Sequence, residues 1–187
     1  MNIHEKTYNF TVVLQPFKHE YSTLEDALFE AECDDALLGK RSGVVYLDFD
    51  RVAENFESAV LSAIKNVESA ETSVKIAYVE PSDLVTAAEI ARRIGNSRES
   101  VRLWIEGKRG CGDFPLPRAG ISGKSVLYSW LDVCLWLKKE SKIDEEECIK
   151  AAVISEVNYV LESEEPRSTR GVLDTYSFDK FRELRPR

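Results

Sequence analysis

The sequence predicts an α+β fold, in which a β-α-β-β-α-β unit precedes a mainly helical unit. Three observations support this prediction. Segments rich in β-branched and aromatic residues alternate with segments of helical periodicity before residue 80. A single Pro81 separates two regularly patterned regions. Five of the nine glycines then lie between Gly107 and Gly123, where we expect loops.

The first elements follow from local patterns. Residues 8–14 (YNFTVVL) predict a strand, because β-branched and aromatic side chains suit a pleated surface. Ser22 and Glu25 form an S-x-x-E capping box, which predicts a helix beginning there. The apolar residues of that helix follow helical spacing: Leu24, Ala27, Leu28 and Ala31.

The next elements complete the first unit. Ser42-Gly43 predicts a hairpin turn between strands at 36–40 and 44–49. A second helix places Phe56, Val60, Ala63, Ile64 and Val67 on one face. Residues 74–79 (VKIAYV) predict the last strand. This order is that of the ferredoxin-like fold, with two helices on one face of a four-stranded antiparallel sheet. Such a fold names no function, so we expect dimerisation or the docking of a partner or ligand.

The second unit begins with two short helices. Thr86 and Glu89 form a T-x-x-E capping box, Gly95 ends the first helix, and Ser97 is a suitable N-cap for the next. The second helix begins at Arg98, and its apolar residues Val101, Trp104 and Ile105 share one face.

This segment resembles the helix-turn-helix. Ala91 is small where the two helices cross, and Gly95 follows four residues later, where the turn requires positive φ. Val101 and Trp104 then enter the core at matching positions. The alternative is an ordinary α-hairpin.

The residues that follow predict a wing. Residues 114–118 and 125–128 predict two short strands joined by the loop 120–123, with a further helix behind them. Residues 84–139 as a whole resemble the MerR-like winged-helix class, particularly excisionase and AlpA-type regulators. The matching motifs are Phe114-Pro115-Leu116-Pro117, Gly123-Lys124-Ser125 and Trp136-Leu137.

Charge separates this segment from the rest. The whole chain has 25 basic and 33 acidic residues, a net charge of −8, which by itself argues against nucleic acid as a partner. Between Thr86 and Lys124, however, eight basic residues outnumber four acidic ones. Affinity for DNA depends on local potential at the phosphates, so one basic face is sufficient.

Candidate DNA-binding residues follow from the geometry of a recognition helix. Its N-terminal part contacts base edges in the major groove, and Arg98, Glu99 and Arg102 lie opposite its apolar face. Serine hydroxyls and the basic wing suit phosphate oxygens, whereas Arg92 and Arg93 are weaker candidates. The predicted DNA-binding residues are Ser97, Arg98, Glu99, Ser100, Arg102, Lys108, Arg109, Lys124 and Ser125.

The remaining residues predict a C-terminal helix at 145–161 and a tail whose end is basic. The helix packs on the preceding unit or pairs with a second copy, and we interpret the tail as an extension that orders on a partner. We therefore divide the chain into a ferredoxin-like domain (1–81), a winged helix-turn-helix domain (82–140) and a C-terminal helix with tail (141–187).

Several function classes are disfavoured. We predict no enzyme, cofactor or metal, because no nucleophile–histidine system or nucleotide loop is present. We interpret Asp48, Asp50 and Glu54 as solvated carboxylates rather than as metal ligands. Cys111 between basic residues is either a redox-sensitive thiol or, as we favour, an incidental surface cysteine. The four cysteines lack C-x-x-C spacing and no membrane span or signal peptide is evident, so we expect a cytoplasmic protein.

The sequence therefore predicts a sequence-specific transcriptional regulator that binds double-stranded DNA. We expect a homodimer that binds an inverted repeat. Two alternatives stay open: an antitoxin or interaction module that neutralises a partner protein through the C-terminal helix and tail, and an excisionase-like architectural factor.

Overall fold

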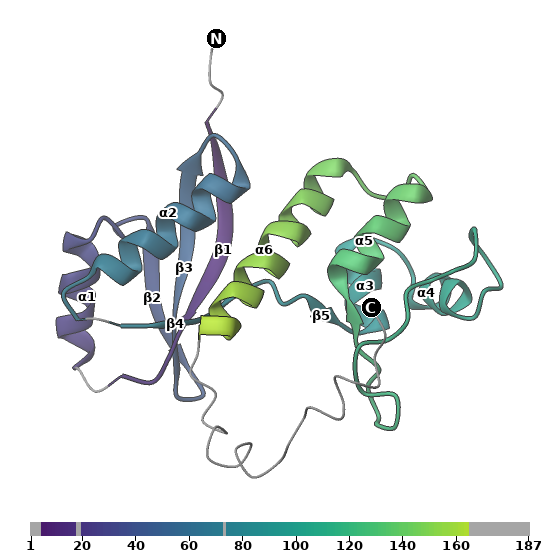
Figure 1. The fold of residues 1–187 in the computed structure, drawn as a ribbon, viewed down its shortest axis with the longest axis horizontal. Coiled ribbons are helices and arrows are strands. Elements are labelled where there is room, and N and C mark those ends of the chain that lie inside the picture. Colours follow the sequence, from purple (N-terminus) through teal and green to yellow (C-terminus); the bar gives the residue numbers. More distant parts are fainter. Residues whose placement is uncertain (1–4, 18–19, 73, 165–187) are drawn as a thin grey trace, which may run out of the picture.

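The computed structural model describes residues 5–17, 20–72 and 74–164, which form an α+β fold with six helices and a four-stranded antiparallel sheet (Figure 1). The predicted α+β class is thus confirmed. The strands are β1 (Lys6–Leu14), β2 (Ala36–Arg41), β3 (Val44–Ala53), β4 (Ile76–Glu80), β5 (Leu84–Val85) and β6 (Tyr128–Ser129). The helices are α1 (Tyr21–Glu30), α2 (Phe56–Ser69), α3 (Ala87–Arg93), α4 (Arg98–Ile105), α5 (Trp130–Lys139) and α6 (Glu145–Glu164).

The four-stranded sheet has the order β2-β3-β1-β4, with every neighbouring pair antiparallel. Its alternating buried side chains pack under α1 and α2, and Phe10 stacks on its cross-strand partner Phe49 at 5.3 Å between ring centroids. The predicted hairpin between β2 and β3 is confirmed. Ser42 and Gly43 both have positive φ, 51° and 85°, as a two-residue type I′ turn requires.

The start of α1 differs from the prediction. The helix begins at Tyr21, its N-cap is Glu20, and no side chain caps it. Ser22 therefore lies inside the first turn and the predicted capping box with Glu25 does not form, because an N-cap residue needs non-helical backbone angles. The apolar stripe is nevertheless correct, since Leu24 and Leu28 are buried. Burying each leucine contributes about 2 kcal/mol.

A buried arginine, which the sequence analysis did not single out, fastens β3 to the loop before β2. The Arg51 guanidinium donates two hydrogen bonds to the Asp35 carboxylate, at 2.8 and 2.7 Å, and one to the Glu32 carbonyl at 2.9 Å. It also contacts the side chains of Ser62 and Asn66 on α2. The arrangement satisfies a guanidinium that would otherwise be costly to bury.

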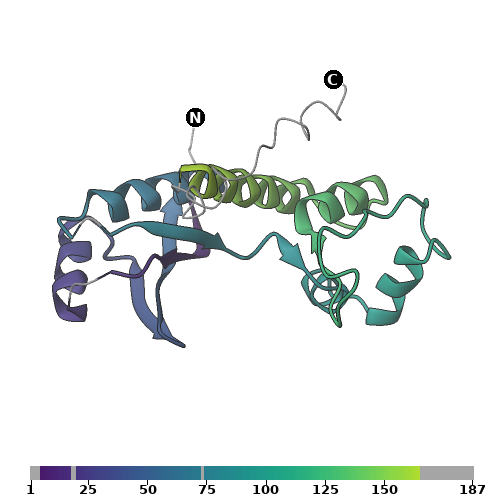
Figure 2. The same ribbon diagram turned by 60° about the horizontal axis from the view of Figure 1, so that its bottom comes forward.

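Two hydrophobic clusters form the core, and α6 contributes to both. The first lies between the sheet and helices α1 and α2 and includes Ile154. The second lies among α3, α4 and α5 and includes Cys148 and Ala151. Figure 2 shows α6 extending from α5 to the sheet. The predicted C-terminal helix is confirmed as an element, whereas most of the predicted tail, residues 165–187, lies outside the described residues.

Helix α6 also completes the outer edge of the sheet at β4. The Val79 N–H donates to Asn158 Oδ1 at 2.7 Å, and Asn158 Nδ2 donates back to the Val79 carbonyl at 2.8 Å. One amide side chain thus replaces a neighbouring strand for both backbone groups of Val79. Within the described ranges, no helix is long and apolar enough to cross a lipid bilayer.

We expect Asn158→Ala to lower the free energy of unfolding by about 2 kcal/mol, because it leaves two partly buried backbone groups of Val79 without partners. Urea denaturation followed by circular dichroism measures the change. The matched control is Glu162→Ala on an exposed position of the same helix. Equal stability of the two variants would contradict this role for Asn158.

Candidate nucleic-acid interface

The α3–turn–α4 segment forms as the sequence predicts. Thr86 caps α3 by accepting a hydrogen bond from the Glu89 N–H at 3.2 Å, and Ser97 caps α4 by accepting one from the Ser100 N–H at 3.1 Å. Between the helices Gly95 has a φ of 62°, and the Asn96 N–H donates to the Ala91 carbonyl at 2.8 Å. The capping residues and the glycine therefore set the direction in which α4 leaves α3.

Packing against α5 fixes the orientation of α4. Val101 and Trp104 are almost wholly buried, as predicted, and Ile105 packs at the margin of the same cluster. The Trp104 ring lies 5.5 Å from that of Trp136 on α5. The opposite face of α4 is left exposed, and Arg98, Glu99 and Arg102 all lie there.

Aromatic contacts hold the loop after α4. Phe114 packs edge-on against Trp136 at 5.1 Å and against Tyr128 at 5.6 Å between ring centroids. The Trp136 indole N–H donates to the Gly112 carbonyl at 2.7 Å. A Cβ at Gly110 would lie 2.9 Å from the Trp136 ring, so the loop approaches α5 too closely for a side chain there. The F-P-x-P segment therefore supplies an anchor for the loop.

The two predicted wing strands are largely absent. Residues 114–118 do not form a strand. The two arms of the predicted wing, residues 114–119 and 125–128, are joined only by the Ala119–Leu127 bridge and by the hydrogen bond from the Arg118 N–H to the Leu127 carbonyl. Pro115 and Pro117 have no N–H to donate, so this arm cannot sustain a ladder. Tyr128–Ser129 pairs instead with β5.

The tip between these arms, residues 120–125, depends on a glycine. Gly120 has a φ of 76°, and a Cβ there would lie 2.0 Å from the Ser125 carbonyl oxygen. The Gly123 N–H closes the turn on the Gly120 carbonyl at 2.9 Å. Lys124 and Ser125, two of the predicted DNA-binding residues, are exposed on this tip.

Arg102 is engaged within its own helix. Its guanidinium pairs with Glu99 at 2.6 Å and also with Glu106. Hydrogen bonds from Arg102 lower the pKa of the Glu99 carboxyl, and those from Lys108 and Arg102 lower the pKa of Glu106. Glu99 and Arg102, which the sequence predicts to contact bases, therefore contact each other. Their ion pair must break before either side chain can contact a base.

Three other cations of the predicted DNA-binding set differ from Arg102 in their surroundings. Over the described part of the chain, no carboxylate forms an ion pair with Arg98, Arg109 or Lys124, and all three are exposed. Lys108 is exposed but pairs with Glu106 at 2.7 Å. The positive potential of this surface therefore comes mainly from the start of α4, the loop after α4 and the tip at residues 120–125.

The two arginines of α3 form ion pairs within that helix. Arg92 and Arg93 both donate to the Glu89 carboxylate, and the Arg93 guanidinium lies 4.9 Å above the Trp130 ring. The Arg93 side chain is 15% exposed, compared with 75% for Arg92. Arg93 thus packs in the structure, and only Arg92 is accessible to a partner.

A notch beside the start of α4 contains two residues that the sequence analysis missed, Asn96 and Lys142. Its volume is about 250 Å³, and these two residues line it together with Ser100, Trp104, Arg109, Gly110 and Glu140. Lys142 follows α5, lies over the Trp104 ring at 5.9 Å, and pairs with Glu140 at 3.2 Å. Lys142 lies far along the sequence from α3 and α4. No local pattern links residue 142 to residue 100, so the sequence did not indicate that they share a site.

Cys111 is not an activated thiol. Its pKa is raised, chiefly by a hydrogen bond with the Glu140 side chain, whereas the sequence suggested that nearby cations lower it. The Cys111 N–H also donates to Glu140 Oε1 at 2.8 Å. A raised pKa leaves less of the reactive thiolate at neutral pH, which agrees better with an incidental surface cysteine than with a redox-sensitive thiol. Cys134, by contrast, is buried in the second core.

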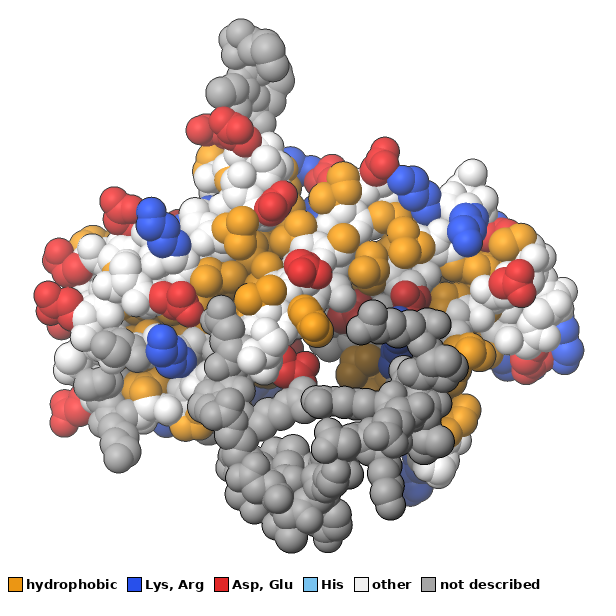
Figure 3. Space-filling model, in the orientation of Figure 1, with side chains coloured by type: hydrophobic (Ala, Val, Ile, Leu, Met, Phe, Trp, Pro, Cys, Tyr) orange, Lys and Arg blue, Asp and Glu red, His pale blue; other side chains and the backbone are white. Residues whose placement is uncertain are grey.

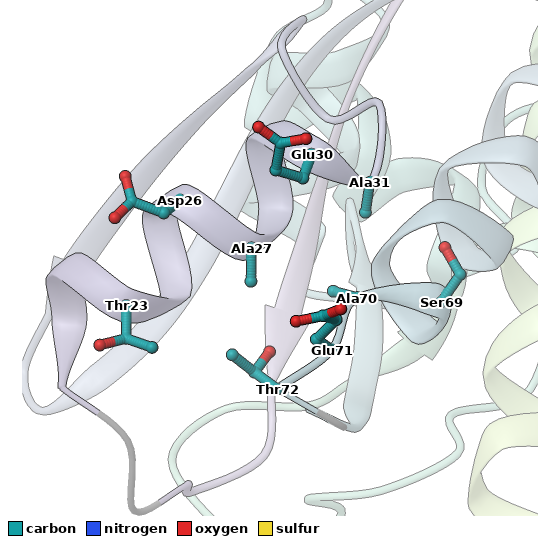
Figure 4. Close-up of a pocket in the computed structure, with 9 residues that line it drawn as sticks. All are labelled: Thr23, Asp26, Ala27, Glu30, Ala31, Ser69, Ala70, Glu71 and Thr72. Carbon is teal, nitrogen blue, oxygen red and sulfur yellow. The ribbon is translucent and has the colours of Figure 1, made fainter.

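Acidic groups elsewhere do not converge. The hollow of about 660 Å³ between α1 and the turn after α2 is lined by Asp26, Glu30 and Glu71, which are spread around its rim (Figure 4). On the open face of the sheet, Thr11 donates to Asp48 at 2.6 Å and Asn9 donates to Asp50. Among the described residues, no group of three or more histidine, cysteine or acidic side chains is arranged to hold a metal ion.

Comparison with protein-family models, with curated proteins and with solved structures returns no match.

The ion pairs within α3 make the stability of this segment depend on pH. Hydrogen bonds from Arg92 and Arg93 lower the pKa of Glu89 from 4.5 to about 2. Because the folded-state pKa is the lower one, the stabilisation is complete above about pH 5 and is lost as the pH falls toward 2.

We therefore expect Glu89→Gln to lower the free energy of unfolding by about 1 kcal/mol at pH 7, and the difference from the unchanged protein to narrow below about pH 4.5. Urea titrations at several pH values measure it. Glu25→Gln, at an exposed position in the middle of α1, is the matched control. A difference that stays constant between about pH 7 and pH 3 would rule out this linkage.

Proposed function

We propose that this protein is a sequence-specific transcriptional regulator that binds double-stranded DNA. In this proposal residues 82–140 act as a winged helix-turn-helix of the MerR-like, AlpA-type class, and residues 1–81 as a ferredoxin-like domain. The exposed face of α4 enters the major groove, and the tip at residues 120–125 contacts the neighbouring backbone or minor groove.

The observation that carries the proposal is the placement of the unpaired cations. Arg98, Arg109 and Lys124 come from three separate segments, and all are exposed without a carboxylate partner among the described residues. Phosphate oxygens are the partners that such cations bind on a duplex. The notch lined by Asn96 and Lys142 supports a further phosphate contact beside the helix start.

A homodimer through the sheet forms part of the proposal. Helices α1 and α2 cover one face of the sheet, and the other face presents Leu37 (72% exposed), Val52 (57%) and Tyr78 (42%). Burial of such side chains favours association. Two-fold symmetry would then place one α4 in each half of an inverted repeat.

We expect the protein to bind DNA from upstream of its own gene, with an affinity that falls as salt rises. Arg98→Ala should weaken specific binding by about tenfold to a hundredfold, as loss of a base contact does. Arg109→Ala and Lys124→Ala should weaken all sequences similarly and lower the salt slope by about 1 each. Fluorescence anisotropy with labelled duplexes measures both quantities, and the same titration reports whether two chains bind per duplex.

The control is Lys65→Ala, an exposed lysine of α2 outside this surface. It should leave the affinity and the salt slope unchanged. Binding that is insensitive to salt, or three interface variants that behave like Lys65→Ala, would refute the proposal.

Glu106→Gln should have the opposite effect. It removes the carboxylate that pairs with Lys108 and one of the two that hold Arg102, so Lys108 becomes available to DNA and Arg102 is held by Glu99 alone. We expect the affinity to rise about threefold to tenfold, as loss of a competing ion pair on the surface permits. Glu25→Gln on α1 makes the same charge change outside this surface and separates the local effect from net charge. No difference between the two variants would show that the ion pairs of Glu106 do not limit DNA binding.

A further inference from the structure

An apolar groove runs between α2 and α6, on the lobe that contains the sheet. Its volume is about 480 Å³. Leu61 on one wall is 49% exposed and Val160 on the other is 42% exposed. The remaining apolar residues that line it are Ile64, Ala152, Val153, Val157 and Leu161. Figure 3 shows hydrophobic side chains gathered over these two helices, and contiguous exposed apolar surface of this kind marks a binding surface.

The rim of the groove carries one sign of charge. Glu57, Glu68 and Glu156 line it, and among the described residues no lysine or arginine does. Across the ranges that the structure describes, none of these three glutamates forms an ion pair. The groove therefore fits an occupant that has apolar side chains and a positive charge. An identical groove from a second copy is disfavoured, because like charges would then face each other.

The end of this chain has the matching composition. Residues 178–187 (FDKFRELRPR) contain four basic and two acidic residues. The apolar residues Phe178, Phe181 and Leu184 recur at every third position of this sequence, and one basic and one acidic residue lie between each pair.

The connection is also short enough. Helix α6 ends at Glu164, a few residues beyond Val160 and Leu161 in the groove wall. Residues 165–177 then link the helix to the basic segment, and an extended chain spans at most about 3.5 Å per residue, which allows this link to reach back along the groove. A tethered segment has an effective concentration in the millimolar range, well above that of a free partner.

We propose that Phe178–Arg187 of the same chain occupies the α2–α6 groove. Phe178 and Phe181 contact its apolar floor, and Lys180 and Arg182 face the glutamates of its rim. The segment covers exposed apolar surface on the lobe opposite α4, and this assignment is independent of whether the protein binds DNA.

Disulfide trapping in the full-length chain tests the proposal. Cys111, the exposed cysteine of the described residues, is first replaced by serine. Leu61→Cys with Phe181→Cys then places one thiol in the groove and one on the tail. In the matched control, Phe29→Cys with Phe181→Cys, the first thiol lies on the exposed side of α1, outside the groove and outside the proposed dimer interface. Under mild oxidation we expect the groove pair to form an intramolecular disulfide at least about tenfold faster than the control pair, because seating the tail raises the local thiol concentration.

A charge test accompanies the trapping experiment. Adding Glu68→Lys and Glu156→Lys to the groove pair should slow trapping severalfold, because the rim would then repel the basic segment. The control reversal is Glu30→Lys on α1, which lies outside the groove and should not slow trapping.

Two outcomes would overturn the proposal. Equal rates for the groove pair and the control pair on α1 would show that the tail does not favour the groove. A disulfide that forms mainly between two chains would show that the occupant is the tail of a second copy. Val160→Cys, on the opposite wall, replaces Leu61→Cys if that variant fails to fold.

Discussion

Helix α6 completes two hydrophobic cores and one sheet edge, and most of the architecture depends on this shared role. Ile154 belongs to the core under the sheet, whereas Cys148 and Ala151 belong to the core of the helical lobe. Asn158 satisfies both backbone groups of Val79 on the edge strand. The short link between β4 and β5 is itself fastened to α5, because Asp83 accepts hydrogen bonds from the N–H groups of Trp130 and Leu131. Helix α6 packs in both cores and therefore also sets how the two lobes lie. Each lobe is small, and neither core is complete without it.

Pairing, more than composition, determines the electrostatic character of the candidate interface. A net charge of −8 describes the chain poorly, because basic residues concentrate around α4 and the tip at residues 120–125. The count of eight basic residues between Thr86 and Lys124, in turn, overstates the positive charge that is available. Arg102 is held by Glu99 and Glu106, and Arg93 is packed on Trp130. The positive potential that a DNA duplex would encounter depends on which guanidinium and ammonium groups lack a carboxylate partner.

Local patterns predicted the elements whose causes are themselves local. The caps at Thr86 and Ser97, the positive φ of Gly95 and the turn at Ser42-Gly43 each depend on a few neighbouring residues, and all were correct. The capping box at Ser22 was wrong because the helix begins at Tyr21 without any side-chain cap. The wing strands were wrong because the prolines of the F-P-x-P motif prevent a ladder. Contacts between distant segments were outside the reach of pattern analysis, since no periodicity relates Arg51 to Asp35, Asn158 to Val79 or Lys142 to Ser100. The exposed positions of α4 accordingly followed from helix geometry, whereas which of them are already engaged by neighbours did not.

The tip at residues 120–125 has a further consequence. Its shape is held by backbone contacts, namely the close approach of Gly120 to the Ser125 carbonyl and the hydrogen bond between Gly123 and Gly120. The side chains of Ile121 and Lys124 are exposed and take no part in those backbone contacts. Position 120 is therefore intolerant of change while exposed neighbours such as Ile121 and Lys124 are not constrained by these contacts, so substitutions there can change the charge and shape of the tip's surface without any loss of fold.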